Sequence, residues 1–464
     1  MAVVELRRAD KDMPRDWLGN FMSMHYVTDK LTGARDLMAR RLATDTTMTV
    51  TARERRYEGL VRREVDFTLE RPGETPVTRT VFWEIDTPVP LPVLECLDYA
   101  AIAMLFFAMR EKARLVIKGA VTAAMLRNME EMNEAWFQLM PDKYALIPIE
   151  AAEILSDRPA AAPGKSKAVV AFSGGIDACF TLIRHLSGHA GYRTAEVQTA
   201  VLVHGFDIPL SAGAAFATAR AAAKTALDEV GVSLSTIRTN WREVAETRWE
   251  MDHMAALAGA LHHFAGPCDV GLFGSDLTHI FHFWPWGSQP GLDCLLSGGR
   301  FLLRPEGQGF ERSTRTELVA SVPALSNNLR VCWAGPLTGG NCGVCEKCIR
   351  TQLNYLAIGK DPGPAFPVRS GVLDALCLNA RHAAQVNYLI DILESADRHG
   401  VTGAWRHAVF INWVVNKALL PYRQNLETWL APVRVIRRLL LKYVRASAAR
   451  GREAVAPPNL ATQA

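Results

Sequence analysis

The chain has 464 residues, of which 49% are hydrophobic and 22% are charged, and its formal net charge at pH 7 is +4. This composition is ordinary for a globular protein and argues against a disordered or fibrous chain. The small net charge excludes a global positive field of the kind that marks many nucleic-acid binders, so any basic surface must be local. The length suits roughly two to four domains of about 100 to 200 residues each.

The sequence gives no sign of a membrane span or a secretory signal. The longest strongly apolar stretch of the N-terminal half, Tyr99 to Met109, is shorter than the ~20 residues that cross a bilayer. The N-terminal sequence MAVVELRRADKD has no long apolar run behind its charges. We therefore expect a cytoplasmic protein without a transmembrane segment, and nothing in the sequence sets its oligomeric state.

The N-terminal part is expected to be an α+β domain. Apolar and polar side chains alternate in residues 65–69 and again in residues 77–85, on either side of the turn sequence Arg71-Pro72-Gly73-Glu74. This pattern predicts a β-hairpin. Two stretches rich in helix formers, residues 94–112 and 121–139, predict helices after it.

A Pro, Ala and Ser-rich stretch divides the chain after the N-terminal part and predicts a linker. Beyond the central part the sequence is helical, with NARHAAQVNYLIDILESADRHG and WRHAVFINWVVNKALL as core-type helices. We therefore expect an N-terminal α+β domain, a linker, a central domain and a helical C-terminal region at residues 1–155, 156–167, 168–361 and 362–464.

Strands and helices alternate in the central part. Short β-rich runs at residues 168–172, 197–204, 234–239 and 269–273 are separated by helical patterns. Such alternation predicts an α/β fold, a parallel sheet that is doubly wound with helices on both faces.

A glycine loop follows the first of these strands. Ser173, Gly174 and Gly175 form a turn, and Asp177 stands at the head of an amphipathic helix. Glycines let backbone amides approach an anion closely, and the helix start adds free N–H groups and the positive end of its dipole. The loop predicts a phosphate or pyrophosphate site, with Asp177 able to hold Mg²⁺. The Walker A lysine is missing, and the alternative is a plain strand-to-helix turn.

The sequence AFSGGIDACF resembles the Ser-Gly-Gly-x-Asp-Ser signature of the PP-loop ATP pyrophosphatases, which split ATP into AMP and pyrophosphate while adenylating a substrate. The last Ser of that signature is Ala178 here. The resemblance implies a five-stranded doubly wound sheet, ATP and Mg²⁺ as ligands, and Ser173 and Asp177 as catalytic residues. It implies ATP contacts at Phe172, Ser173, Gly174, Gly175, Ile176, Asp177, Asp207 and Ser275.

Two of these positions have other interpretations. The second predicted strand ends in VHGFDIP, so His204 and Asp207 are expected at the carboxyl edge of the sheet, where such sheets bind ligands. Asp207 is equally suited to a turn before Pro209. For His204 we expect a structural role.

Four of the nine cysteines cluster. Cys342, Cys345 and Cys348 are spaced C-x2-C-x2-C, and Cys332 precedes them by ten positions. Thiolates at this spacing can close a tetrahedral zinc site, and an iron–sulfur cluster is the alternative. The remaining cysteines are expected to be small buried hydrophobic residues: Cys96, Cys179, Cys268, Cys294 and Cys377.

The glycine loop and the cysteine cluster, in this order, are together similar to the 7-cyano-7-deazaguanine synthase family. The resemblance implies an ATP-dependent ligase that activates a carboxylate or a related oxygen for attack by ammonia or an amine. Its substrate would be a small carboxylate or a nucleobase-like molecule.

The segment between the two motifs is polar and aromatic, and it is expected to follow the fourth strand. It contains His279, His282, Trp284 and Trp286, which could line a pocket for a flat or polar substrate or belong to a local core. The candidate substrate residues are Ser288, Asp293 and Arg312. Arg312 and Arg350 could meet phosphate or carboxylate, or serve in salt bridges.

The C-terminal tail is basic. Residues 431–452 carry seven basic and no acidic side chains, interleaved with apolar ones. This predicts an amphipathic helix that either has a solvated face or contacts an acidic partner such as nucleic acid. A PP-loop enzyme that modifies tRNA or a nucleobase is therefore one alternative function. Ala178, in place of the signature's last Ser, makes a non-catalytic ATP-binding subunit the other.

Overall fold

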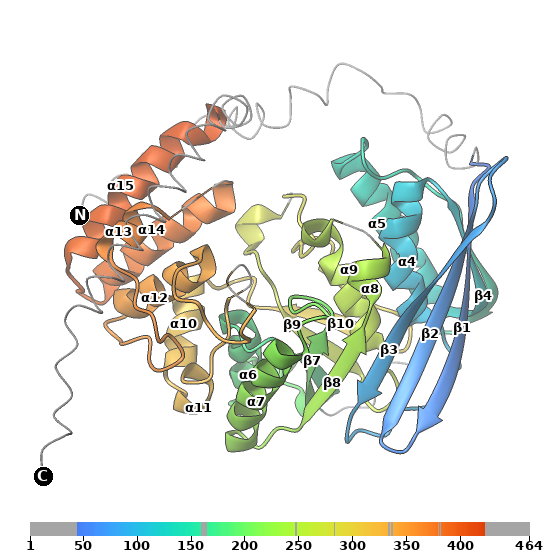
Figure 1. Ribbon diagram of the computed structural model, residues 1–464, viewed down its shortest axis with the longest axis horizontal. Coiled ribbons are helices and arrows are strands. Elements are labelled where there is room, and N and C mark those ends of the chain that lie inside the picture. The colour runs from blue at the N-terminus through green and yellow to red at the C-terminus, as the bar shows by residue number, and fades with distance from the viewer. Residues whose placement is uncertain are drawn as a thin grey trace, which may run out of the picture.

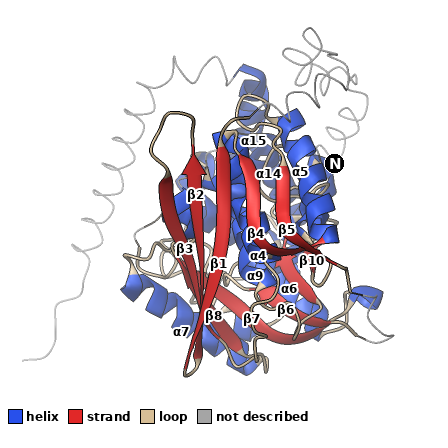
Figure 2. Cartoon of the chain, turned by 90° about the vertical axis from the view of Figure 1, so that its right-hand side faces the viewer, coloured by secondary structure: helices blue, strands red, loops and turns tan. Residues whose placement is uncertain are grey.

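The computed structural model describes residues 44–158, 165–245, 248–282, 284–332, 335, 337–378, 380 and 382–422. The basic tail predicted at residues 431–452 lies outside these residues, as do residues 159–164 of the linker predicted at 156–167. The fold is α/β, with one ten-stranded sheet running through the molecule in the order β10-β9-β6-β7-β8-β3-β2-β1-β4-β5 (Figures 1 and 2). The strands are β1 (Thr47–Tyr57), β2 (Leu60–Glu70), β3 (Val77–Asp86), β4 (Arg114–Thr122), β5 (Ile149–Leu155), β6 (Lys167–Ala171), β7 (Glu196–His204), β8 (Leu234–Thr239), β9 (Val270–Gly274) and β10 (Leu302–Glu306).

Some helices cover this sheet, and others form a helical region beyond one end of it. They are α4 (Asp98–Glu111), α5 (Ala123–Leu139), α6 (Ile176–Leu186), α7 (Gly213–Glu229), α8 (Trp241–Ala245), α9 (Trp249–His262), α10 (Arg312–Ala320), α11 (Pro323–Ser326), α12 (Glu346–Ala357), α13 (Val372–Leu376), α14 (Ala383–Arg398) and α15 (Ala404–Leu419). Helices α4 and α5 lie beside β1 to β4, while α10 to α15 gather at the opposite end (Figure 1).

Strands β6 to β10 form a parallel half of the sheet. The chain adds β7 and β8 on one side of β6, then returns to place β9 and β10 on the other side. The order therefore reverses between β6 and β9, and ligands of open α/β sheets bind at the carboxyl ends of the strands at such a point.

Side chains of these strands alternate between two cores. Val169, Val201 and Ile237 belong to one hydrophobic cluster together with residues of α4 and α9. Val170 and Leu202 point to the other face, into a cluster with residues of α6 and α7. Because both faces are covered, the strands consist largely of apolar residues, as expected for a parallel sheet wound on both sides.

The N-terminal strands are not a separate sheet. Strand β3 pairs antiparallel with β8 through Trp83 to Asp86, which joins the predicted hairpin β2–β3 to the parallel half. In α9, an added Cβ at Gly259 would lie 2.9 Å from the Cβ of Ala103 in α4, so these two helices cross at close range. The sheet is thus larger than the five strands that we expected, because the two predicted domains share strand pairing and a core.

The elements with a clear local pattern agree with their prediction. The segment 234–239 is β8, and the expected strands at residues 168–172, 197–204 and 269–273 each agree within one residue at either end. Strands β1, β4, β5 and β10 were not predicted. The domain boundaries stay predictions.

The C-terminal helices fulfil their prediction in part. Helix α14 is largely buried, as a core helix should be. Helix α15 is correctly placed but half-exposed, with Ile411, Val414 and Val415 open to solvent. Among the described residues, no helix combines the length and the apolar character needed to cross a bilayer.

Candidate functional site

The glycine loop joins β6 to α6 at the carboxyl edge of the parallel strands. Gly174 has a φ of 78°, a left-handed conformation that any side chain would strain. Its carbonyl oxygen accepts a hydrogen bond of 2.8 Å from the backbone N–H of Arg330. Gly175 is the N-cap residue of α6, so the first N–H groups of this helix open beside the loop. This geometry suits an anion.

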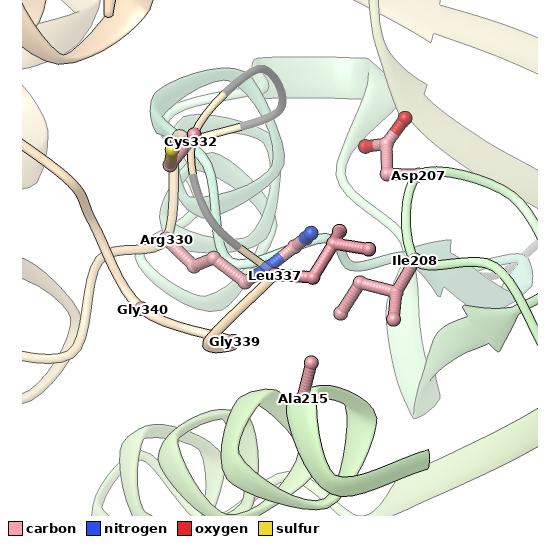
Figure 3. A pocket seen from close by; sticks show the side chains of 9 residues that line it. Asp207, Ile208, Ala215, Arg330, Cys332, Leu337, Gly339 and Gly340 are labelled. Atoms are coloured by element: carbon pink, nitrogen blue, oxygen red, sulfur yellow. The ribbon is translucent and has the colours of Figure 1, made fainter. Parts of the chain in front are cut away.

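A pocket lies beside the segment that holds the loop in place. Asp207 and Ile208 line one side, Gly339 and Gly340 line another, and Arg330 reaches into it (Figure 3). Asp207 is exposed and makes no hydrogen bond or ion pair with the described residues. The pocket therefore offers both an open carboxylate and a guanidinium.

His204 has the structural role that we expected. Its ring stacks on Phe216 at 4.2 Å between ring centroids, and its Nε2 lies 3.1 Å from the carbonyl oxygen of Pro209. Burial lowers the pKa of His204, so the ring is neutral at pH 7 and Nε2 donates to that carbonyl.

Asp177 lies on the other side of the loop and is held by two arginines of α10. Arg312 Nη1 donates to Asp177 Oδ2 at 2.6 Å, and Arg315 Nη1 donates to Asp177 Oδ1 at 2.7 Å. Burial acts to raise the pKa of Asp177, but the two guanidinium charges outweigh it and the pKa lies below its usual value. The carboxylate is thus ionised and already engaged.

Arg315 also ties this centre to the end of β9. It donates to the carbonyl oxygens of Ser275 at 2.6 Å, Gly307 at 2.8 Å and Phe310 at 3.0 Å. The guanidinium is 2% exposed, and these bonds fix its plane. The sequence did not single out Arg315, although its spacing from Arg312 places both on one face of a helix.

A second acidic group stands next to Ser275. Asp276 Oδ2 accepts a hydrogen bond of 3.2 Å from Trp286 Nε1 and lies 3.6 Å from His253 Nε2. Burial acts to raise the pKa of Asp276, but His253 lowers it below the usual range. Burial acts to lower the pKa of His253, whereas Asp276 raises it. The two residues therefore form an ion pair at the carboxyl end of β9.

Three predicted residues meet in one buried chain of hydrogen bonds. Ser288 Oγ lies 3.4 Å from Ser275 Oγ and donates to Asp293 Oδ2 at 3.1 Å, while Asp293 Oδ1 accepts from the Gln289 N–H at 2.9 Å. Burial raises the pKa of Asp293 to about 7. These side chains are 1% exposed or less, so they brace the loop after β9.

The four clustered cysteines converge as predicted. All four Sγ atoms lie within 4.8 Å of one another. Cys345 Sγ lies 3.8 Å from Cys332 Sγ, and Cys342 Sγ lies 4.0 Å from Cys348 Sγ. Metal–sulfur bonds of about 2.3 Å around a tetrahedral ion place the sulfurs about 3.8 Å apart. The cluster could therefore bind one metal ion such as zinc.

The cysteine cluster supports both the glycine loop and α12. Cys332 follows Arg330, which holds Gly174, and Cys345 is the N-cap residue of α12. Asn341 braces the segment, because its Oδ1 accepts from the N–H groups of Val331 at 2.8 Å and Cys332 at 3.2 Å. A metal ion bound here would fix the geometry of both neighbours.

The predicted site residues thus fall into groups. Asp177, Arg312 and Ser275 meet at one centre, whereas Asp207 lies at the pocket on the other side of the glycine loop. The side chains of Phe172 and Ile176 are buried in the core, so only their backbones could contact a ligand there. Among the remaining cysteines, Cys179 and Cys268 are buried and Cys96 and Cys377 are half-buried. The prediction was wrong for Cys294, which is exposed at the start of a short helical turn.

Comparisons with models of protein families, with curated proteins and with solved structures found no match for this chain. Its chemistry must therefore be inferred from its own residues.

Proposed function

We propose that the chain is an ATP-dependent adenylating enzyme, similar to 7-cyano-7-deazaguanine synthases, that activates a carboxylate or a related oxygen for attack by nitrogen. The observation that carries this proposal is the position of the glycine loop. Its left-handed Gly174 and the start of α6 stand at the carboxyl edge where the strand order reverses between β6 and β9. Phosphate groups bind at such a point in many α/β proteins.

In the proposed reaction a carboxylate oxygen of the acceptor attacks the α-phosphorus of ATP. The bond from that phosphorus to the bridging oxygen breaks, and pyrophosphate leaves. Ammonia or an amine then adds to the acyl carbon, a proton passes from nitrogen to solvent, and AMP leaves with the electrons of the C–O bond. Backbone N–H groups of the loop and the Ser173 hydroxyl would stabilise the phosphate charge.

Two metal ions belong to this proposal. Zn²⁺ in the cysteine cluster would be structural, because four thiolates leave no open position for a substrate. Mg²⁺ would neutralise the phosphate charge. Asp177 is its candidate ligand, and Arg312 would then turn from this carboxylate toward the phosphates.

One observation favours a second candidate, a non-catalytic ATP-binding subunit. Asp177 is held by two guanidinium groups, and Ala178 stands where the PP-loop signature has a hydroxyl. A subunit of this kind would bind ATP without releasing pyrophosphate. For the tRNA-modifying alternative, the basic tail lies outside the described residues.

Pyrophosphate release from ATP and Mg²⁺ tests the proposal, with small carboxylates and nucleobase-like acids offered as acceptors. We expect release that depends on the acceptor, and a Ser173→Ala variant at least about tenfold slower because it loses a hydrogen bond to charge. Ser321→Ala is the control and should match the wild type, because it removes an exposed hydroxyl that bonds, within the described part of the chain, only the Leu318 carbonyl. ATP binding without release would select the second candidate, and no ATP binding would end both.

A further inference from the structure

Two arginines near Tyr388 are buried and carry N–H groups without a partner. The Arg312 side chain is 9% exposed and the Arg350 side chain is 5% exposed. Arg312 Nε and Arg350 Nη1 have no hydrogen-bond partner among the described residues. Arg350 Nε lies 2.7 Å from Glu346 Oε1, an ion pair that leaves Nη1 unsatisfied.

One of these arginines stacks on the Tyr388 ring, and the charges of both act on its hydroxyl. The Arg350 guanidinium lies over Tyr388 at 4.1 Å from the ring centroid, and the Tyr388 hydroxyl donates to the Asp276 carbonyl oxygen at 3.1 Å. Burial raises the pKa of Tyr388, while the positive charges of Arg350 and Arg312 act against this rise. Helices α10, α12 and α14 therefore bring two cations to the carboxyl end of β9.

Arg315 shows how a structural arginine is satisfied in the same place. It donates to Asp177 and to three backbone carbonyls, so its buried charge is fully used. A buried charged group without such partners costs about 1–3 kcal/mol or more for each missing bond, and native proteins rarely keep one. The open donors of Arg312 and Arg350 thus call for a different explanation.

The centre is also accessible. The side chain of Asp276 is 41% exposed, and the Trp286 that bonds it is half-buried. When His253 is protonated, its positive charge offsets the negative charge of Asp276 3.6 Å away. An anion could therefore enter beside this pair without meeting an unpaired carboxylate.

We propose that Arg312 and Arg350 form an oxyanion-binding subsite, built by α10 and α12 over Tyr388, which takes one phosphate or carboxylate group. Planar guanidinium groups bind such oxygens through paired, charge-assisted hydrogen bonds. The subsite does not depend on adenylation. Only its use for the acceptor's acid group or for the phosphates of ATP rests on the proposed function.

Calorimetric titration of the full chain with inorganic phosphate tests the subsite. We expect Arg350→Gln to weaken phosphate binding by about tenfold or more, because it removes one charged donor pair. Arg369→Gln is the matched control, since it removes the same charge from an exposed pair with Asp361. Equal binding by both variants would overturn the subsite. The zinc content of each variant shows whether the cysteine cluster beside Arg350 is intact.

A more conservative variant tests the same subsite if Arg350→Gln does not fold. Arg350→Lys retains the charge and loses the planar fork, so we expect phosphate binding to weaken several-fold relative to Arg369→Lys, and equality would again contradict the subsite. Competition experiments then show which molecule supplies the bound oxyanion. Displacement of phosphate by ATP assigns the site to the nucleotide, and displacement by succinate in the presence of ATP assigns it to an acceptor carboxylate. Phosphate binding without pyrophosphate release would leave the subsite standing and remove the adenylation.

Discussion

The cysteine cluster and the Asp177 centre both lie next to the glycine loop in the sequence or through a hydrogen bond of Arg330, but they are built in opposite ways. The cluster takes its four side chains from one short segment, residues 332–348, and its donors are chemically alike. The Asp177 centre combines side chains from α6, the loop after β9, α10, α12 and α14. The residue spacing in the sequence is enough to predict the cysteine cluster. The Asp177 centre forms only when the helices pack against one another.

The difference also concerns what holds each centre together. The cysteine cluster could be held together by a metal ion, because four thiolates gathered around one point repel each other without a cation. The Asp177 centre depends on its own ion pairs, which offset the cost of burying charge only while every partner is present. The two centres should therefore respond to different perturbations.

Loss of the metal should have the largest effect. We expect about one zinc ion per chain and its loss in Cys345→Ser, with structural zinc worth about 10 kcal/mol or more of apparent binding free energy. Hydrogen exchange should then rise in residues 329–358, which the cluster supports. Cys294→Ser, at an exposed cysteine away from the cluster, is the control. A Cys345→Ser protein with full zinc content would contradict the assignment.

Removing the carboxylate of the second centre should come next. Asp177→Ala leaves Arg312 and Arg315 buried without their counter-charge, so we expect a loss of about 3–5 kcal/mol in the free energy of unfolding. Urea unfolding measures it. Asp361→Ala breaks an exposed pair with Arg369 and should cost no more than about 1 kcal/mol. Similar losses for the two variants would mean that the Asp177 pairs are not effectively buried.

The loop after β9 should make stability depend on pH. Since burial raises the pKa of Asp293 to about 7, well above the ordinary aspartate value of about 3.9, the folded state favours the protonated form. The stabilisation is complete below the unfolded pKa and is lost progressively as pH rises from there to about 7, roughly 4 kcal/mol in all.

Asp293→Asn isolates this contribution, because the amide cannot ionise. Urea unfolding of both proteins at pH 5.5 and pH 8, both values being about one unit from the folded pKa, should show a larger loss of stability for the wild type at the higher pH. Parallel pH profiles for the two proteins would show that Asp293 stays charged.

The smallest effect concerns the glycine loop that both centres flank. Gly174→Ala places a side chain at a φ of 78° and should cost about 1–2 kcal/mol of stability and weaken ATP binding. Gly175 has a φ of −82°, and an added Cβ would lie at ordinary contact distance, 3.4 Å from Ser173 Oγ and 3.6 Å from the Arg330 carbonyl oxygen. Gly175→Ala should therefore cost less than Gly174→Ala, at most about 1 kcal/mol, because Ala is a poorer N-cap residue than Gly. An equal loss at both positions would contradict the left-handed conformation of Gly174.

The features that could be predicted from the sequence are those that depend on one short segment of the chain. The hairpin β2–β3, the strand β8 and the cysteine cluster were predicted because each depends on neighbours in the sequence: alternation, a turn, or a spacing. Strands β1 and β4 were missed. β1 carries exposed polar side chains along much of its length, and β4 has a register shift between Ile117 and Ala120, so neither shows a clean alternation.

By itself, the sequence determined the α/β alternation of the central part, the position of the glycine loop and the set of four thiols. Only the tertiary structure decided that β3 pairs with β8 in one sheet, that Asp177 is held by Arg312 and Arg315, and that Arg350 lies over Tyr388. The physical reason is the separation in sequence over which each kind of interaction acts. Backbone propensity and motif spacing act within a few residues, whereas Asp177 and Arg312 are 135 positions apart and meet only when the strand order brings α6 and α10 together.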